Sequence, residues 1–451
     1  MGVQLELDLT DLTRAKTARW RLPPGAAPTA DDMLPDPLAV YTTLWGLSTQ
    51  LEHIKGPLGG PPGPWLVSVL LLCLAAALRP QNRTLAAVAF SMRCIWWLSR
   101  WPFMWASEII GGLTDLSVVL HLIAADRHVD DSNGVGLSVR RQVAWFYVFA
   151  GFWKLNTSFL DHRYSCASVF IAQLLDAHAP PHLLTPDNVE LAIRAAPALT
   201  VALELGVGVC MLLGEYATSP VRVVCRPAGV VLALLLHLGI DVTPPPHNIA
   251  NFSHKIGLRY LWFAPHGTTA AACEVLRRPL SVGAAYAALA AASLALTVAL
   301  QQPAVWAQWT SSPLSSLRDL NVCRVDWHVC AHVALTALLL RGLWLGEGRA
   351  ARTHAVAPPW ALVHFNTAIC ILWAGGTVVL GTSDNSTPNM YSNLRQQGGS
   401  NHLLPVPMSL LQAWRYQGHA VGADPFSGGL VRIEHRAPLP APHGPLAACH
   451  A

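Results

Sequence analysis

Long apolar segments with very few charges are the feature of this sequence that most restricts its fold. Only 12% of the residues are charged, whereas soluble domains average about 25%. An α-helix needs about 20 apolar residues to cross the hydrocarbon core of a bilayer. The sequence therefore predicts an all-α, multi-pass transmembrane helical bundle with about eight or nine spans. The candidate segments are 65–78, 85–101, 105–125, 138–159, 191–213, 228–242, 282–300, 327–345 and 360–380.

Composition divides the chain into three regions. Residues 1–64 are polar and proline-rich, which predicts an extramembrane N-terminal arm with one amphipathic helix over 38–54. Residues 65–411 contain the apolar segments, and 412–451 form a polar, low-complexity C-terminal tail. The net charge of +4 and the absence of a basic stripe argue against a nucleic-acid partner, so the expected partner is the lipid membrane.

Lys154 follows the aromatic run AWFYVFAGFW inside one apolar segment. A charge at the centre of a bilayer costs about 3 kcal/mol or more, so this lysine must reach the interface, form a pair or lose its proton. One hypothesis is a lysine at a helix end whose amine extends to water, because Asn156, Ser158 and Asp161 follow closely. The other is a desolvated lysine that acts as a base or binds an anionic ligand.

Two neighbouring segments carry charges at matching intervals. Arg93 and Arg100 are seven residues apart and share a helix face, and Glu108 and Asp115 do the same on the next segment. A hairpin turn at Pro102 would bring the two faces together. The result is either a buried ladder of ion pairs or a pathway for a substrate or a proton.

Two further apolar segments contain acids. Glu204 is a single acid in VALELGVG, and its expected partner is Lys154 or a neighbouring arginine. His237 and Asp241 are four residues apart on one helix face, so the carboxylate could orient the imidazole. A histidine hydrogen-bonded between helices is an equally consistent interpretation of His237.

Motifs for metal and nucleotide chemistry are weak. His328 and His332 have the spacing of metal ligands, but no third ligand follows nearby, so no metal site is expected. The sequence contains no P-loop and no GxSxG motif, which removes support for nucleotide-driven and serine-hydrolase functions.

Three stretches resemble, in order, the HTTM (horizontally transferred transmembrane) domain proteins and the related membrane core of the vitamin K-dependent γ-glutamyl carboxylases. They are FYVFAGFWKLNTSFLDHRYS (146–165), HLGIDVTPPPHNIANFSHKIGLRYLWFAP (237–265) and NMYSNLRQQGGSNHLL (389–404). The matching positions in the first two are Ala150, Gly151, Lys154, Leu155, His237, Phe252, Ser253, Ile256, Gly257, Tyr260 and Pro265. The third is similar to the Ser-Asn-His-Leu run of bacterial HTTM-like proteins.

The resemblance implies a lysine-initiated reaction. In the carboxylases the lysine matching Lys154 is regarded as the base that deprotonates vitamin K hydroquinone, so the implied cofactor is a reduced quinone. The implied catalytic residues are Lys154 and His237. Among the expected substrate-binding residues, Tyr260, Asn401 and His402 lie in the resembling stretches. The others are the charged residues of the apolar segments, Glu204, Asp241, Arg93 and Arg100. The carboxylases carry a lysine pair where this chain has Trp153-Lys154, and their propeptide-binding lumenal region has no counterpart, so glutamate carboxylation is not expected.

The expected function is binding of a lipid-soluble or anionic substrate in a polar intramembrane cavity, with catalysis on it as an extension. The alternatives are a transporter or ion-coupling protein and a non-catalytic scaffold. The expected location is the endoplasmic reticulum or another endomembrane in a eukaryote, and the plasma membrane in a bacterium. Four Asn-x-Ser/Thr glycosylation sequons would report the topology, at Asn82, Asn156, Asn251 and Asn385.

Overall fold

The structure is a computed structural model that describes residues 36–53, 63–100, 105–124, 132–243, 250–263, 283–292, 327–346, 359–380, 387–388, 391–394 and 401–405. All of these lie in one compact unit, Pro35–Ala451, and the other unit, Met1–Leu34, lies outside the described residues. The predicted tail over 412–451 and the predicted corner at Pro102 also lie outside them.

Every regular element among the described residues is helical. In order they are α2 (Pro37–His53), α3 (Pro64–Leu78), α4 (Arg83–Ser99), α5 (Ala106–Ala124), α6 (Ser132–Trp153), α7 (Thr157–Leu160), α8 (Cys166–His178), η2 (Pro181–Leu183), α9 (Pro186–Tyr216), α10 (Ser219–Asp241), α11 (Ala250–Arg259), η3 (Tyr260–Phe263), the helix Gly283–Ala292, α16 (Trp327–Gly346), α17 (Trp360–Ile371), the π-helix η4 (Leu372–Gly376) and α18 (Thr377–Leu380). A single antiparallel bridge joins Asn156 to His402.

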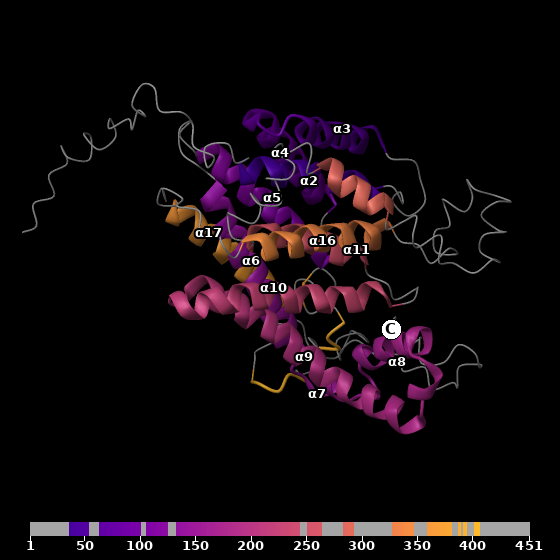
Figure 1. Cartoon of the computed structure of the whole chain (residues 1–451). Coiled ribbons are helices and arrows are strands. Elements are labelled where there is room, and N and C mark those ends of the chain that lie inside the picture. Colours follow the sequence, from indigo (N-terminus) through magenta and orange to yellow (C-terminus); the bar gives the residue numbers. More distant parts are fainter. Residues whose placement is uncertain are drawn as a thin grey trace, which may run out of the picture. The chain divides into compact units, whose positions relative to one another are not determined.

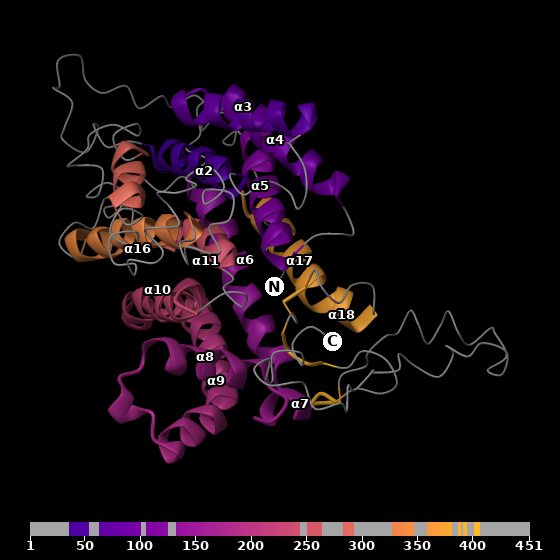
Figure 2. The ribbon, with the colours of Figure 1, turned by 90° about the vertical axis from the view of Figure 1, so that its right-hand side faces the viewer.

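Helix α6 is the centre of the arrangement. It packs against α5, α9, α11 and α17, while α2, α3, α4 and α5 pack in succession on one side and α8 packs on α9 on the other. Both ribbon views show α6 running between the group of α2 to α4 and the group of α7 to α9 (Figures 1 and 2). Helix α6 contacts α9 of the second group directly, and it is joined to the first group through α5, which packs on both α4 and α6.

Four of the described helices are long and apolar enough to cross a membrane, judged by length and composition. They are Ala106–Ala124, Pro186–Tyr216, Pro220–Asp241 and Trp360–Leu380. Some of the other predicted segments form shorter helices, such as α3 with 15 residues and α4 with 17. The all-helical class predicted from the sequence is thus confirmed, and membrane-compatible helices are present, while eight or nine spans stay a prediction.

Local sequence signals explain where several helices begin. Asn82 caps α4 by accepting a hydrogen bond from the Leu85 amide, and Thr185 caps α9 in the same way with the Asn188 amide. The segment predicted as one helix to residue 159 ends instead at Trp153, because the Asn156 side chain accepts from the Phe159 amide and starts α7. Lys154 therefore lies one residue beyond the end of α6.

The helix expected over 38–54 is present as α2. Its residues Tyr41 and Trp45 are almost completely buried, at 2% and 0% exposure, and α2 packs on α3. Although α2 falls within the predicted arm of residues 1–64, it belongs to the same compact unit as the other described helices.

Candidate functional site

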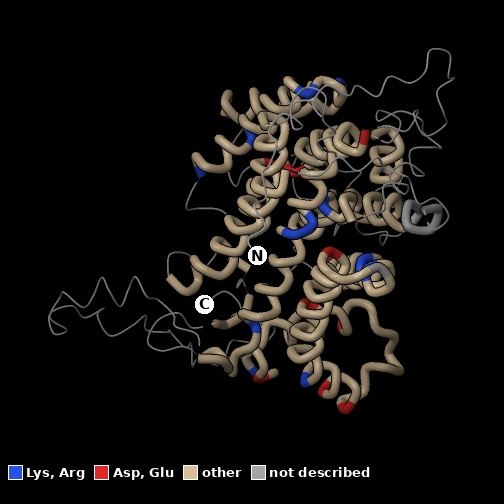
Figure 3. Tube along the Cα trace, turned by 90° about the vertical axis from the view of Figure 1, so that its left-hand side faces the viewer, with Lys and Arg blue, Asp and Glu red and all other residues tan. Residues whose placement is uncertain are grey.

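A cavity of about 390 Å³ lies between α6, α8, α9 and α10, and Thr387, Pro388 and Tyr391 contribute to its wall. Most of its lining side chains are apolar, among them Phe146, Phe170 and Leu203. The volume is within the roughly 300–1,000 Å³ range of sites for small organic ligands. Charged residues are sparse along the described helices (Figure 3), so a charged residue in the cavity wall is a distinctive feature.

Lys154 and Glu204 are the charged residues of this wall. The Lys154 Nζ lies 2.8 Å from Glu204 Oε2 and also donates to Oε1 at 3.0 Å, and the side chains are only 8% and 12% exposed. Of the two kinds of partner predicted for Glu204, Lys154 or a neighbouring arginine, the structure has Lys154. A lysine extending to water would need an exposed amine, whereas this amine is buried beside the cavity.

Glycines bring the two charged residues within reach of each other. A Cβ added at Gly151 of α6 would lie 2.9 Å from the Leu205 nitrogen, and one at Gly208 of α9 would lie 2.6 Å from the Val148 nitrogen. Contacts this close exclude any side chain, so the glycines let the backbones of α6 and α9 approach directly. Glu204 consequently faces the end of α6 where Lys154 lies.

The chain immediately after Lys154 is held by a distant segment. The Thr157 amide donates to the Asn401 carbonyl at 3.0 Å, and the Leu403 amide donates to the Leu155 carbonyl at 2.9 Å. The His402 Nε2 lies 2.8 Å from the Phe152 carbonyl oxygen. Asn401 and His402 are not among the cavity-lining residues, so the structure gives them a positioning contact beside Lys154 rather than a place in the cavity.

The loop after α7 carries an exposed ion pair outside the cavity. The Arg163 Nε donates to Asp161 Oδ1 at 2.9 Å, and this hydrogen bond lowers the pKa of the Asp161 carboxyl to about 2. The carboxylate is therefore ionised at neutral pH, although its exposure to water limits what it contributes to stability.

Tyr147 joins the cavity to a buried polar cluster. Its ring lines the cavity, and its hydroxyl contacts both the His237 Nε2 and the Tyr260 hydroxyl. The other ring nitrogen of His237, Nδ1, lies 3.0 Å from the Ser253 Oγ. His237 and Tyr260 therefore lie one residue behind the wall, and Tyr147, which sequence reasoning missed, is the one that faces the cavity.

Asp241 does not orient His237, contrary to the hypothesis drawn from their spacing. Its Oδ2 contacts the Nδ1 of His332 on α16, and the rings of His237 and His332 lie 6.0 Å apart. His328 instead lies beside His254, with 3.4 Å between the two Nδ1 atoms. No group of three or more metal-binding side chains occurs among the described residues.

The charge ladder predicted for the α4–α5 hairpin is present. The Arg93 Nη1 lies 3.2 Å from Asp115 Oδ2, and the Arg100 Nη1 lies 3.1 Å from Glu108 Oε1. Neither arginine lines the cavity. The structure therefore assigns both to an ion-pair ladder outside the cavity, whereas the sequence-based hypothesis placed them at the substrate.

Two parts of the cavity wall had no clear signal in the sequence. Helix α8 supplies Cys166, Ala167 and Phe170, although its 13 residues are too few for a predicted span. Tyr391 also lines the wall, with a φ of 61° in the left-handed region that a tyrosine rarely adopts. Neither a short helix nor one backbone angle can be assigned to a cavity from composition alone.

The fold and site define the class as an all-helical protein with membrane-compatible helices and a ligand-sized apolar cavity that contains one buried ion pair. A family model described as a domain of unknown function (DUF8388) matches residues 400–439. The match begins next to Asn401 and His402, the residues that hold the chain after Lys154. No similar protein is found among curated proteins, and none among solved structures.

Proposed function

We propose that this chain is a multi-pass integral membrane protein of the HTTM and vitamin K-dependent carboxylase-like group, and that its cavity binds a lipid-soluble molecule. The observation that carries the proposal is a largely apolar cavity whose wall contains the Lys154–Glu204 ion pair. Apolar walls favour a hydrophobic body, and the ion pair favours an acidic or hydrogen-bonding head.

Exposed lining residues support entry from the bilayer. Leu199 of α9 and Leu235 of α10 both line the cavity, yet their exposed fractions are 64% and 59%. Both belong to helices long and apolar enough to cross a membrane. A cavity that reaches the surface between two such helices would open toward lipid, so a ligand could enter without passing through water.

The polar groups also favour a head with two oxygen functions. Tyr147 of α6 and Lys154, one residue beyond the end of α6, line the same cavity, and seven residues at the rise of an α-helix span about 10.5 Å. Two protein groups that each form a hydrogen bond with one of two oxygens on opposite sides of a six-membered ring are separated by a comparable distance. A reduced quinone such as vitamin K hydroquinone therefore fits this spacing, with Lys154 as the donor to one oxygen and the Tyr147 hydroxyl, which also contacts His237 and Tyr260, as the acceptor for the other. When bound, such a group would supply the redox chemistry.

A reaction initiated at the ion pair is the extension of this proposal. Glu204 can accept a proton from an acidic ligand hydroxyl, which leaves the ligand as an anion beside the protonated amine of Lys154. The charge is conserved, because the carboxylate becomes neutral as the ligand becomes negative. Lys154→Arg keeps a positive charge, but it replaces the compact amine with a planar guanidinium. The variant should therefore still bind the ligand but no longer convert it.

Transport is the second candidate function. A carboxylate and an amine that face each other in an apolar cavity could also exchange a proton with a transported anion. Purified protein in liposomes separates the two. A pH-dependent solute flux that leaves the solute chemically unchanged would favour transport.

Native mass spectrometry of the full chain in a mild detergent tests binding. After incubation with a reduced naphthoquinone, wild-type protein should carry one added ligand mass. Lys154→Ala should lose the added mass, because the cavity wall then has no cation to bind the head of the ligand. Leu199→Trp should slow the appearance of the added mass, because the larger side chain narrows the opening of the cavity. Arg194→Ala is the matched control, since Arg194 forms an exposed pair with Glu190 on α9. Equal occupancy in all four proteins would contradict the proposal.

A further inference from the structure

Arg259 is a completely buried cation on α11 that lies apart from the cavity. Its exposed fraction is 0%, and its Nε and Nη2 have no hydrogen-bond partner among the described residues. Its Nη1 contacts the carbonyl oxygen of Lys255, one turn earlier on the same helix. A buried guanidinium without a counter-ion costs several kcal/mol, so this position needs an acceptor that the described side chains do not supply.

The neighbouring charges balance without Arg259. Three carboxylates and three other cations of the region pair with one another: Arg93 with Glu52 and Asp115, and Arg100 and Lys255 with Glu108. Asp115 lies within electrostatic range of Arg259, but its ion pair is formed with Arg93. Among the described residues, Arg259 is thus the one positive charge in excess here.

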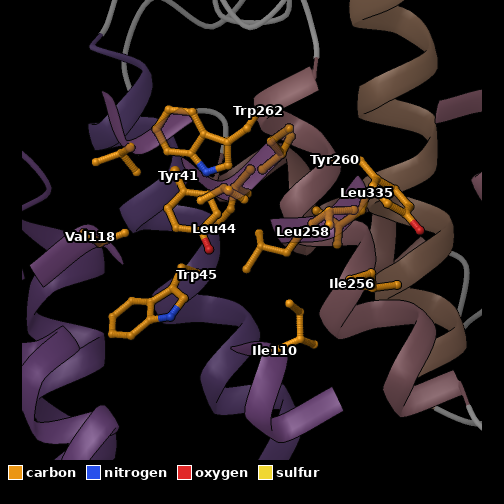
Figure 4. Packing of buried hydrophobic residues seen from close by; sticks show 14 of the residues in the cluster. Tyr41, Leu44, Trp45, Ile110, Val118, Ile256, Leu258, Tyr260, Trp262 and Leu335 are labelled. Atoms are coloured by element: carbon orange, nitrogen blue, oxygen red, sulfur yellow. The ribbon is translucent and has the colours of Figure 1, made fainter. Parts of the chain in front are cut away.

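Tyr41 brings a second donor to the same place. Its hydroxyl is buried without a hydrogen-bond partner among the described residues, and it lies within electrostatic range of Arg259. The Tyr41 ring lies beside Trp262, as Figure 4 shows, with 5.2 Å between the two ring centroids. The Tyr41 hydroxyl is therefore a second buried donor without a partner among the described residues, in a region that also contains the Asp115 and Glu52 carboxylates.

A glycine makes room for the guanidinium against α5. A Cβ added at Gly111 would lie 3.0 Å from the Arg259 Nη2, whereas one at Gly112 would meet only Trp97 at 3.6 Å, an ordinary contact. The guanidinium is thus seated against the backbone of α5 at a position where a larger residue would displace it.

We propose that Arg259 and Tyr41 form a buried binding site for a small monovalent anion, with chloride as the probe. The Arg259 Nε and Nη2 and the Tyr41 hydroxyl are donors without partners among the described residues, and the Asp115 Oδ2, which also has no hydrogen-bond partner there, is paired with Arg93. The described charges of the region sum to one positive charge, which an anion that accepts from both donors would neutralise. The site is separate from the cavity, since neither residue lines it.

The full chain in detergent tests the proposal through its thermal unfolding. At constant ionic strength, replacing gluconate with chloride should raise the unfolding temperature of wild-type protein in a saturable way. Arg259→Gln should abolish the chloride dependence. Tyr41→Phe should shift the chloride midpoint by about 2- to 10-fold, because one hydrogen bond is lost. Arg194→Gln, an exposed arginine, should behave as wild type.

A second pair of variants keeps the test decisive if Arg259→Gln does not fold. Gly111→Ala should weaken the chloride dependence by displacing the guanidinium, and Gly112→Ala should leave it intact. Bromide in place of chloride should also give an anomalous scattering peak beside Arg259 in crystals. An unfolding temperature that is the same in chloride and gluconate, or a chloride effect that persists in Gly111→Ala and Arg259→Gln, would overturn the proposal and indicate buried water instead.

Discussion

At the scale of single residues, the Lys154–Glu204 pair is the feature with the greatest consequences. Both side chains are largely buried, and each is the other's ionic partner across α6 and α9. Removing one partner of a buried pair leaves an uncompensated charge, which costs about 3–5 kcal/mol. Replacing both with apolar residues removes that cost.

This asymmetry gives a prediction for stability. Lys154→Met and Glu204→Leu should each lower the free energy of unfolding by about 3 kcal/mol, while the double variant should recover most of that loss. Chemical or thermal unfolding in detergent measures all three. The exposed pair Arg194–Glu190 is the control, where single changes should have effects of about 0.5 kcal/mol or less. Additive losses in the double variant would show that the two residues do not interact.

At the scale of elements, the close approach of α6 and α9 positions this pair. Gly208 has no room for a side chain, because a Cβ there would lie 2.6 Å from the Val148 nitrogen. Gly206, two residues earlier on α9, faces open space, with nothing within 4 Å of an added Cβ. A substitution at Gly208 therefore tests the contact between α6 and α9, whereas a substitution at Gly206 tests only the helix propensity of the new residue.

Alanine at each position should have opposite effects. Gly208→Ala should push α9 away from α6, destabilise the protein by about 1–3 kcal/mol and reduce ligand retention in native mass spectrometry. Gly206→Ala should instead stabilise it by about 0.5–1 kcal/mol, because alanine is the better helix former. If both variants retain ligand and stability equally, the contact between the helices does not position the pair.

At the scale of the whole molecule, the fold determines which glycosylation sequons a modifying enzyme can reach. Asn82 is exposed in the α3–α4 turn, whereas Asn156 is 0% exposed and donates to the Trp153 and Ser392 carbonyls. Asn385 lies outside the described residues.

Expression in microsomes should therefore modify these sites unequally. We expect no glycan at Asn156 whichever side of the membrane it occupies, because its amide is buried and hydrogen-bonded. Asn82 should accept one if its turn is lumenal. The mobility shift on glycosidase treatment of Asn→Gln variants identifies each site. A glycan at Asn156 would be incompatible with its contacts to Trp153 and Ser392.

Apolar runs and charge spacing were enough to predict part of this structure. They predicted the helical class, an ion-pair ladder between the two arginines and the two acids of one hairpin as one of two alternatives, and Lys154 as one of two kinds of partner for Glu204. The two hairpin pairs follow from periodicity within neighbouring helices, because residues seven apart share a face. An acid in an apolar helix must find a cation, so the need for a partner at Glu204 could also be inferred.

Only the tertiary structure decided which distant groups meet. No local pattern connects the positions that meet in three contacts. Asp241 pairs with His332, and Tyr147 lies between His237 and the cavity. Asn401 and His402 hold the chain beside Lys154 through hydrogen bonds. The cavity likewise depends on α8 packing against α9. Local sequence fixes which residues share a helix face, whereas the packing of all helices together selects which faces come into contact.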